Sequence, residues 1–181
     1  MSYPERIEGR VGVYERWDPA RHTAAFTALC ADPEVMEHLG GAEPQVVSAE
    51  LSERIGDHWA TFGFGLWACL DGEACVGFAG AARPGPNWTA FGDDVEIGWR
   101  LARAAWGRGF ATEGARLALP AVAEHLGLER VIAFIAPGNT RSRAVARRLG
   151  MQRIGDARHT HLDQYVDVYG LAIAPVVEAA A

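Results

Sequence analysis

The sequence predicts a single mixed α/β domain. The chain has 181 residues, the size of one domain, and its 49% hydrophobic and 22% charged residues are typical of a globular protein. Asp71-Gly72 separates two short apolar runs, which is a hairpin signal. Downstream, strand-like runs alternate with long helical patterns. Without a repeat or an obvious linker, we expect residues 1–181 to form one domain.

The N-terminal third carries helix signals. Asp18-Pro19 and Asp32-Pro33 each combine an N-cap residue with proline at the first helical position. Gly40-Gly41 is expected to end the second, short helix. Between Ser48 and about Thr61, an apolar residue recurs at every fourth position, which indicates an amphipathic helix.

The middle of the chain predicts a hairpin, a strand and a helix. The hairpin comprises Leu66–Leu70 and Ala74–Ala81, and Val95–Leu101 is the next expected strand. A long apolar-periodic helix is expected from Phe110 to about Leu126. Pro120 lies inside it and should kink or shorten it.

The last third predicts three strands and a helix. Val131–Ile135 is fully apolar, as in a strand buried on both faces. A helix is expected from Asn139 to Leu149, with Gly150 as its C-cap. Strands near Met151–Thr160 and Tyr165–Ile173 complete the expected fold.

Several classes of protein are disfavoured by composition. No apolar run reaches the roughly 18 residues of a membrane span, and the N-terminus leads into no apolar signal region. The three cysteines are an odd number without metal-ligand spacing, which is typical of reduced thiols. We therefore expect a cytoplasmic protein without a membrane partner.

Charge is distributed unevenly along the chain. The formal net charge is −6, and all 17 basic residues are arginine. Residues 95–153 nevertheless contain ten arginines and four acids, a local net charge of +6. This segment could bind a polyanionic ligand, or it could form solvated arginine-rich helix faces. Nucleic acid is disfavoured because an acidic chain repels a long phosphate backbone, whereas a compact phosphorylated cofactor would be repelled less.

A glycine-rich turn precedes the long helix. Gly107-Arg108-Gly109 lies between the expected strand and the start of that helix, where unpaired first-turn amides favour a phosphate or pyrophosphate. No Gly-Lys-Ser/Thr follows, so this is not a P-loop. Thr112 stands where a dinucleotide fingerprint needs its third glycine, and the next strand does not end in an acid.

Three ordered motifs together resemble the core of a GNAT-superfamily N-acetyltransferase. They are Val95-Glu96-Ile97-Gly98-Trp99-Arg100-Leu101, Trp106-Gly107-Arg108-Gly109-Phe110-Ala111-Thr112-Glu113, and Asn139-Thr140-Arg141-Ser142 through Leu149-Gly150-Met151. The branch that acetylates ribosomal-protein N-termini looks most similar.

The resemblance implies a splayed, mostly antiparallel central sheet of about seven strands flanked by helices, with acetyl-CoA as cosubstrate and no metal. In the family, the second motif cradles the pyrophosphate, and the first binds the pantetheine arm through backbone groups. Either the Trp99 or the Arg100 amide would bond the thioester oxygen. The implied cofactor-binding residues are Trp99, Arg100, Leu101, Trp106, Gly107, Arg108, Gly109, Phe110, Ala111, Thr112, Asn139 and Ser142. Arg108, Arg141 and Arg143 are candidates for the 3′-phosphate.

The catalytic groups are less determined. Glu96 matches a strand glutamate that acts as general base in some members; alternatively it satisfies buried polar groups or positions substrate. Many members place a tyrosine acid where this chain has Ala146, which leaves Ser142 and Tyr165 as candidates. The protein would acetylate a small-molecule or peptide N-terminal amine, as a monomer or homodimer. A CoA-binding protein without transferase activity is the alternative.

The acceptor site is expected to involve Gly40–Val47, Trp88 and the turn His159–Tyr165. His159 and His161 would share one strand face near Asp163, which permits a metal site, but a solvated or acceptor-facing surface fits better without a fourth ligand.

Overall fold

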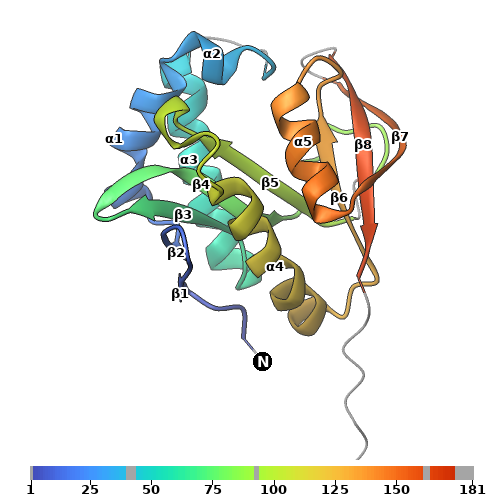
Figure 1. Ribbon diagram of the computed structural model, residues 1–181, viewed down its shortest axis with the longest axis horizontal. Helices are drawn as coiled ribbons and strands as arrows, with labels where there is room; N and C mark the ends of the chain where they lie inside the picture. Colours follow the sequence, from blue (N-terminus) through green and yellow to red (C-terminus); the bar gives the residue numbers. More distant parts are fainter. Residues whose placement is uncertain (1, 40–43, 92–93, 161–163, 174–181) are drawn as a thin grey trace, which may run out of the picture.

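The computed structural model describes residues 2–39, 44–91, 94–160 and 164–173, and its mixed α/β architecture confirms the predicted fold class (Figure 1). An eight-stranded sheet has the order β1-β2-β3-β4-β5-β6-β8-β7, with only β5 and β6 parallel. The strands are β1 (Arg6–Glu8), β2 (Val13–Arg16), β3 (Leu66–Asp71), β4 (Ala74–Ala82), β5 (Glu96–Leu101), β6 (Arg130–Ile135), β7 (Gln152–His159) and β8 (Gln164–Ala172).

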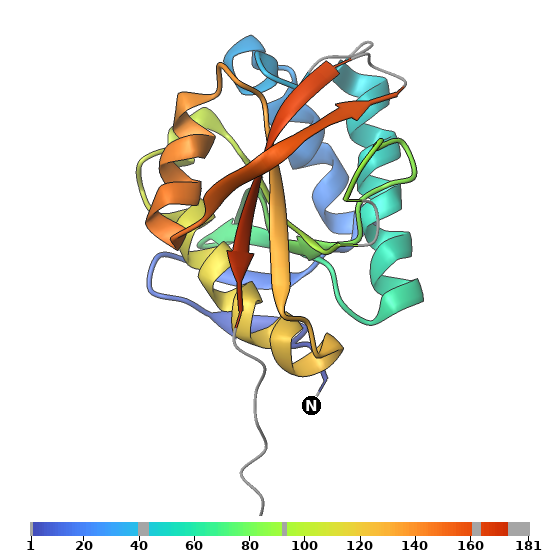
Figure 2. The same cartoon turned by 90° about the vertical axis from the view of Figure 1, so that its right-hand side faces the viewer.

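Helices cover both faces of this sheet (Figures 1 and 2). The helices α1 and α3 lie on one face, which we call the α1 face, and α4 and α5 lie on the opposite, α4 face. The α-helices are α1 (Pro19–Cys30), α2 (Pro33–Met36), α3 (Pro44–Phe62), α4 (Phe110–Leu126) and α5 (Thr140–Leu149), and a short 3-10 helix spans Arg103–Ala105.

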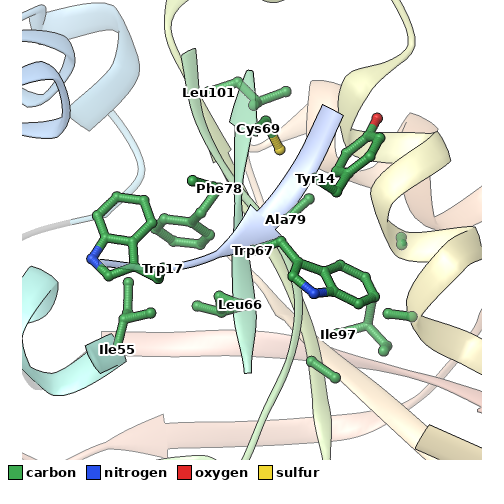
Figure 3. Packing of buried hydrophobic residues seen from close by; sticks show 14 of the residues in the cluster. Tyr14, Trp17, Ile55, Leu66, Trp67, Cys69, Phe78, Ala79, Ile97 and Leu101 are labelled. Carbon is green, nitrogen blue, oxygen red and sulfur yellow. The ribbon is translucent and has the colours of Figure 1, made fainter. Parts of the chain in front are cut away.

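The core forms because alternate strand residues point to opposite faces. Phe78 of β4 packs against Trp17 and Phe26 on the α1 face, with ring centroids 6.2 and 5.5 Å away. Its neighbour Ala79 points toward α4, beside Tyr14 and Trp67 (Figure 3). Gly114 brings α4 so close that an added Cβ would lie 2.6 Å from the Cβ of Ala79.

Two short strands were not predicted. The sequences of β1 and β2, Arg-Ile-Glu and Val-Tyr-Glu-Arg, are too short and too polar for a periodic signal, and their pairing with β3 makes them strands. The count is therefore eight rather than about seven. The predicted hairpin is confirmed, because Asp71 pairs with Ala74 around a two-residue turn.

Two helices differ from expectation. The helix expected from Ser48 begins at Pro44, and its first turn lacks the apolar periodicity that set the predicted start. The helix α4 continues through Pro120, so the proline does not shorten it. The Gly40-Gly41 helix end lies outside the described residues.

The central pair of strands, β5 and β6, diverges. One residue pair is in register, Glu96 with Ile132, and the Ile132 amide donates to the Val95 carbonyl at 2.9 Å. Beyond this point β5 runs toward α2 while β6 runs toward the start of α5 (Figure 1). The C-terminal half of β5 therefore has a strand neighbour only on its β4 side.

Candidate active site

The divergence leaves one backbone position of β5 open. Along a strand, the backbone amide and carbonyl groups of every second residue point to the same edge. The Val95 carbonyl points to the β6 edge, so the backbone groups of Trp99 and Leu101 point to that edge as well. The Leu101 carbonyl accepts from the Trp106 indole nitrogen at 2.9 Å. The groups of Arg100 point toward its β4 partner, Phe78. Of the two expected amides, that of Trp99 is therefore the one that faces the opening.

The glycine-rich turn is exposed at the start of α4. Gly107 and Gly109 have φ angles of 73° and 102°, in the left-handed region that favours glycine. Both glycines and Arg108 are exposed. The first helical bond of α4 runs from the Glu113 amide to the Gly109 carbonyl, so the three preceding amides have no partner within the helix. This geometry suits an anion.

Glu113 ties the turn to the N-terminal segment. Its carboxylate accepts from the amides of Arg10 and Val11, at 2.8 and 3.0 Å, and from the Tyr14 hydroxyl at 3.1 Å. The acid in the first turn of α4 is thus directed toward the β1–β2 connection and away from the exposed amides.

The three arginines considered for the 3′-phosphate all have acidic partners. Arg108 makes two bonds to the Asp71 carboxylate, at 2.6 and 3.0 Å, and this pairing lowers the pKa of Asp71. Arg141 lies 3.2 Å from Glu37, and Arg143 lies 3.6 Å from Asp167. A phosphate would have to compete with these carboxylates or join the pairs.

Trp106 connects the turn to α5. The Arg141 guanidinium lies over its indole ring, 4.2 Å from the ring centroid, while the indole nitrogen is bonded to Leu101. The same arginine contacts Glu37 just after α2. Trp106 therefore connects the end of β5 with α5.

Glu96 lies at the last point where β5 and β6 are paired. Alternation along β5 places its side chain on the α1 face. Burial raises the pKa of Glu96 to about 7, although the nearby charges of Arg100 and Arg54 oppose that rise. A carboxylate with this pKa can take up a proton near neutral pH.

Asn139 and Ser142 lie at the start of α5. The Asn139 side chain caps the helix by accepting from the Ser142 amide at 3.0 Å. The Ser142 hydroxyl lies 3.2 Å from the Trp99 indole nitrogen. Because an indole nitrogen only donates, Ser142 accepts this bond and its own hydrogen remains available. Ser142 is on the α4 face, opposite Glu96.

Tyr165 and Ala146 belong to the same side as Ser142. In β8, Tyr165 alternates with Asp167, whose carboxylate meets Arg143 of α5. Tyr165 is 61% exposed, and the Arg158 guanidinium lies 5.8 Å from its ring. Ala146 is fully buried in a cluster with Ala133, and Trp99 and Tyr169 pack against this cluster.

Trp88 is not a free platform for an acceptor. Its ring stacks on Phe134 with centroids 4.0 Å apart, and its backbone forms a bridge with His159. The expected place of Trp88 at the acceptor site stays a prediction, and its apolar partner on β6 is one that local sequence does not reveal.

Some predicted features cannot be placed. His161, Asp163 and much of the expected acceptor segment Gly40–Val47 lie outside the described residues. Within the described part of the chain, no cluster of three or more histidine, cysteine or acidic side chains is arranged to hold a metal ion. No helix in that part is long and apolar enough to cross a bilayer.

The sequence analysis missed the side chains of Arg54 and Arg100. Arg100 was considered only for its backbone amide, yet its side chain shares the α1 face with Glu96. The alternation of β5 could have indicated this; the approach of Arg54 from α3 could not have been read from sequence.

Comparison with known proteins agrees with this geometry. A family model described as an acetyltransferase (GNAT) domain matches residues 13–152. "Uncharacterized protein YkkB" of Bacillus subtilis is 31% identical over 126 residues, which cover 70% of this chain and 73% of the relative. FsC-acetyl coenzyme A-N(2)-transacetylase of Aspergillus fumigatus is 32% identical over 155 residues, covering 82% of this chain and 62% of that protein. The chain thus spans less than two thirds of the Aspergillus enzyme.

Solved structures share the fold. An acetyltransferase from Agrobacterium tumefaciens has a TM-score of 0.76 at 24% identity, covering 94% of this chain and 95% of its own. A putative acetyltransferase from T. thermophilus has a TM-score of 0.72 at 27% identity, covering 97% and 93%. The ribosomal L7/L12 α-N-protein acetyltransferase RimL, at 15% identity and a TM-score of 0.71 over 96% and 94%, is similar in fold alone. This chain belongs to the GNAT acetyltransferase family, whose members use acetyl-CoA.

Proposed function

We propose that this protein is a single-domain N-acetyltransferase that moves the acetyl group of acetyl-CoA to a primary amine, by direct attack in a ternary complex. Acetyl-CoA supplies the activated acyl group. The observation that carries the proposal is the divergence of β5 from β6, which leaves the Trp99 backbone amide on the edge of β5 that β6 no longer pairs, with Glu96 on one face of the sheet and Ser142 on the other.

The described residues fit the cosubstrate. The amides of the exposed Gly107–Gly109 turn, with those in the first turn of α4 that have no partner within the helix, would hold the pyrophosphate, and the helix dipole would favour its charge. The Trp99 amide would donate to the thioester oxygen, where negative charge develops during attack. Asn139 would hold the start of α5 in place through its cap on the Ser142 amide.

The two faces of the sheet would divide the proton transfers. On the α1 face, Glu96 would accept a proton from the attacking amine, directly or through water. On the α4 face, the Ser142 hydroxyl would donate a hydrogen bond to the departing sulfur. Tyr165 stands on that same face, and its exposed ring makes it the second candidate for this role.

The proposal predicts that Glu96→Gln lowers kcat by about 10²- to 10⁴-fold while the affinity for acetyl-CoA stays within about twofold, because only the general base is lost. Wild-type kcat/KM should rise with pH and level off above about 7. Thiol release over a panel of amines measures both quantities. Glu129→Gln, which neutralises an exposed acid before β6, is the matched control.

An unchanged pH–rate profile in Glu96→Gln would remove the base role from this residue. The absence of a tyrosine at Ala146 favours a second function, binding of CoA without transfer. Tight binding of acetyl-CoA with no thiol release for any amine would support that second function. Absence of CoA binding at high micromolar concentration would refute both.

A further inference from the structure

Arg100 differs from most arginines of the basic segment. Six of the ten arginines between residues 95 and 153 pair with carboxylates from outside the segment: Arg103, Arg108, Arg130, Arg141, Arg143 and Arg153. In the described part of the chain, Arg100 has no carboxylate in contact. Its guanidinium lies beside two packed rings, 5.5 Å from the centroid of Phe26 and 5.8 Å from that of Phe78.

The polar contacts of Arg100 are weak. One terminal nitrogen donates to the Cys30 sulfur at 3.5 Å, and the Nε atom is buried without a hydrogen-bond partner among the described residues. Burial lowers the pKa of this arginine. A largely buried cation without a carboxylate is disfavoured by desolvation, and a thiol and two aromatic rings offset only part of that penalty. An apolar side chain would fill this space without a desolvation penalty, so we expect the charge of Arg100 to have a binding partner.

A second arginine adds positive charge at the same place. Arg54 of α3 is exposed and acts electrostatically on both Glu96 and Arg100. Within the described residues, Arg54 makes no ion pair. Two arginine charges thus act on Glu96 from the α1 face, although the whole chain carries a net charge of −6.

Gly98, which has no side chain of its own, separates Glu96 from Arg100 along β5. Residues two apart on a strand share a face, so Gly98 lies between them, and its partner on β4 is Gly80. A Cβ added at Gly98 would lie 3.8 Å from Oε1 of Glu96 and 3.7 Å from Leu66. The Glu96 carboxylate thus reaches over Gly98, on the same face as the Arg100 side chain.

We propose that the acceptor is a small amine that carries its own oxyanion, a carboxylate or a phosphonate, which the Arg100 guanidinium binds while the amine lies at Glu96. This inference rests on the proposed acetyl transfer for the position of the amine. The oxyanion would supply the missing counter-charge of Arg100, and a bond between a guanidinium and an oxyanion is among the strongest available in a protein.

The test compares amines that differ only in their charged group. Thiol release is measured with wild type and Arg100→Met for glycine, glycinamide and aminomethylphosphonate. A longer series built on β-alanine is measured in the same way. We expect wild-type kcat/KM to be at least tenfold higher for one of the anionic amines than for the matching amide. In Arg100→Met this ratio should fall to about one. Preference for the amides, or for peptides with neutral N-termini, would overturn the inference.

Two controls separate loss of the charge from loss of the fold. Arg100→Met keeps a long side chain beside Phe26 and Phe78 and removes a cation that burial disfavours. Its melting temperature should therefore equal or exceed that of wild type. Arg16→Met removes an arginine that lies over the Trp59 ring and pairs with the exposed acid Glu5. Arg16 is on β2, three strands away from β5 in the sheet. It should retain the preference for anionic amines.

A binding measurement distinguishes failure of this inference from failure of the proposed function. N-acetylglycine, N-acetylglycinamide and N-acetylaminomethylphosphonate are titrated by calorimetry into wild type and Arg100→Met. If wild type binds either anion selectively and Arg100→Met does not, the role of Arg100 is supported. If in addition no amine is acetylated, only the transferase proposal fails. Equal affinities for the anions and the amide in wild type would overturn the role of Arg100 even if acetylation is observed.

Discussion

At the scale of the residue, the surroundings of Glu96 act on its pKa in opposite directions. Burial favours the neutral acid, and the positive charges of Arg100 and Arg54 favour the carboxylate. Burial has the larger effect, so the pKa of about 7 places the proton uptake of this group near physiological pH. The same balance makes Glu96 a source of pH-dependent stability, separate from any role in catalysis.

Glu96→Gln should therefore raise the free energy of unfolding at pH 8, by on the order of 1 to 3 kcal/mol, because the charged carboxylate is disfavoured in the fold. The folded protein binds this proton more tightly than the unfolded chain does. The contribution of the protonated acid is present below pH 4.5 and is lost as the pH rises through about 7. Urea unfolding of both proteins from pH 4.5 to 8 measures the difference, which should vanish at the acidic end. A difference independent of pH would contradict the assignment.

At the scale of the element, α4 begins and ends on glycines in the left-handed conformation. Gly109 precedes its first turn with φ 102°, and Gly127 follows its last turn with φ 63°. The two ends have the same conformational requirement and different surroundings. Gly109 is part of the exposed turn that we expect to bind a pyrophosphate. Gly127 is far along the chain from that turn, and an added Cβ there meets nothing within 4 Å.

Gly109→Val and Gly127→Val therefore form a matched pair. Each should destabilise the fold by about 1 to 2 kcal/mol, because a β-branched residue disfavours a positive φ. Only Gly109→Val should lose acetyl-CoA binding in equilibrium dialysis, since its side chain would stand where a pyrophosphate must approach the amides. Equal loss of binding in both variants would show that helix stability, and not the turn, controls affinity.

At the scale of the whole molecule, two histidines connect helices to the strands and loops that pack beside them. His22 of α1 contacts buried Glu15 at 3.2 Å and accepts from the Asp18 amide at 3.0 Å. His58 of α3 bonds the Phe64 carbonyl at 2.9 Å and accepts from the Arg83 amide at 2.9 Å. Burial lowers the pKa of both imidazoles. Their contribution to stability is present above the ordinary histidine pKa and is lost as the pH falls.

The double variant Glu96→Gln, His58→Gln should show a shallower loss of unfolding free energy between pH 7 and 5 than Glu96→Gln alone. The glutamine amide can both donate and accept, as His58 does, but it does not titrate. The Glu96→Gln background removes the opposing contribution of that acid. Denaturant unfolding at half-unit pH steps gives both slopes, and identical slopes would show that His58 does not contribute.

The sequence by itself determined the features that depend on neighbours along the chain. The hairpin at Asp71-Gly72, the glycine turn before α4 and the Asn139 cap of α5 follow from the conformational preferences of a few adjacent residues. The ordered motifs were also enough to identify the family. Strands β1 and β2 escaped prediction because they are too short to show periodicity and depend on pairing with β3.

Only the tertiary structure decided which charges remain uncompensated. The local charge of +6 was compatible with a polyanion site or with solvated arginine-rich helix faces. In the described chain, six of these arginines pair with acids from other segments, as Arg103 does with Asp32 and Arg141 with Glu37. Arg100 is left among phenylalanines without a carboxylate partner in the described chain. The physical reason is that backbone preferences act over a few residues, whereas ion pairing and desolvation depend on distances in space that the folded chain alone creates.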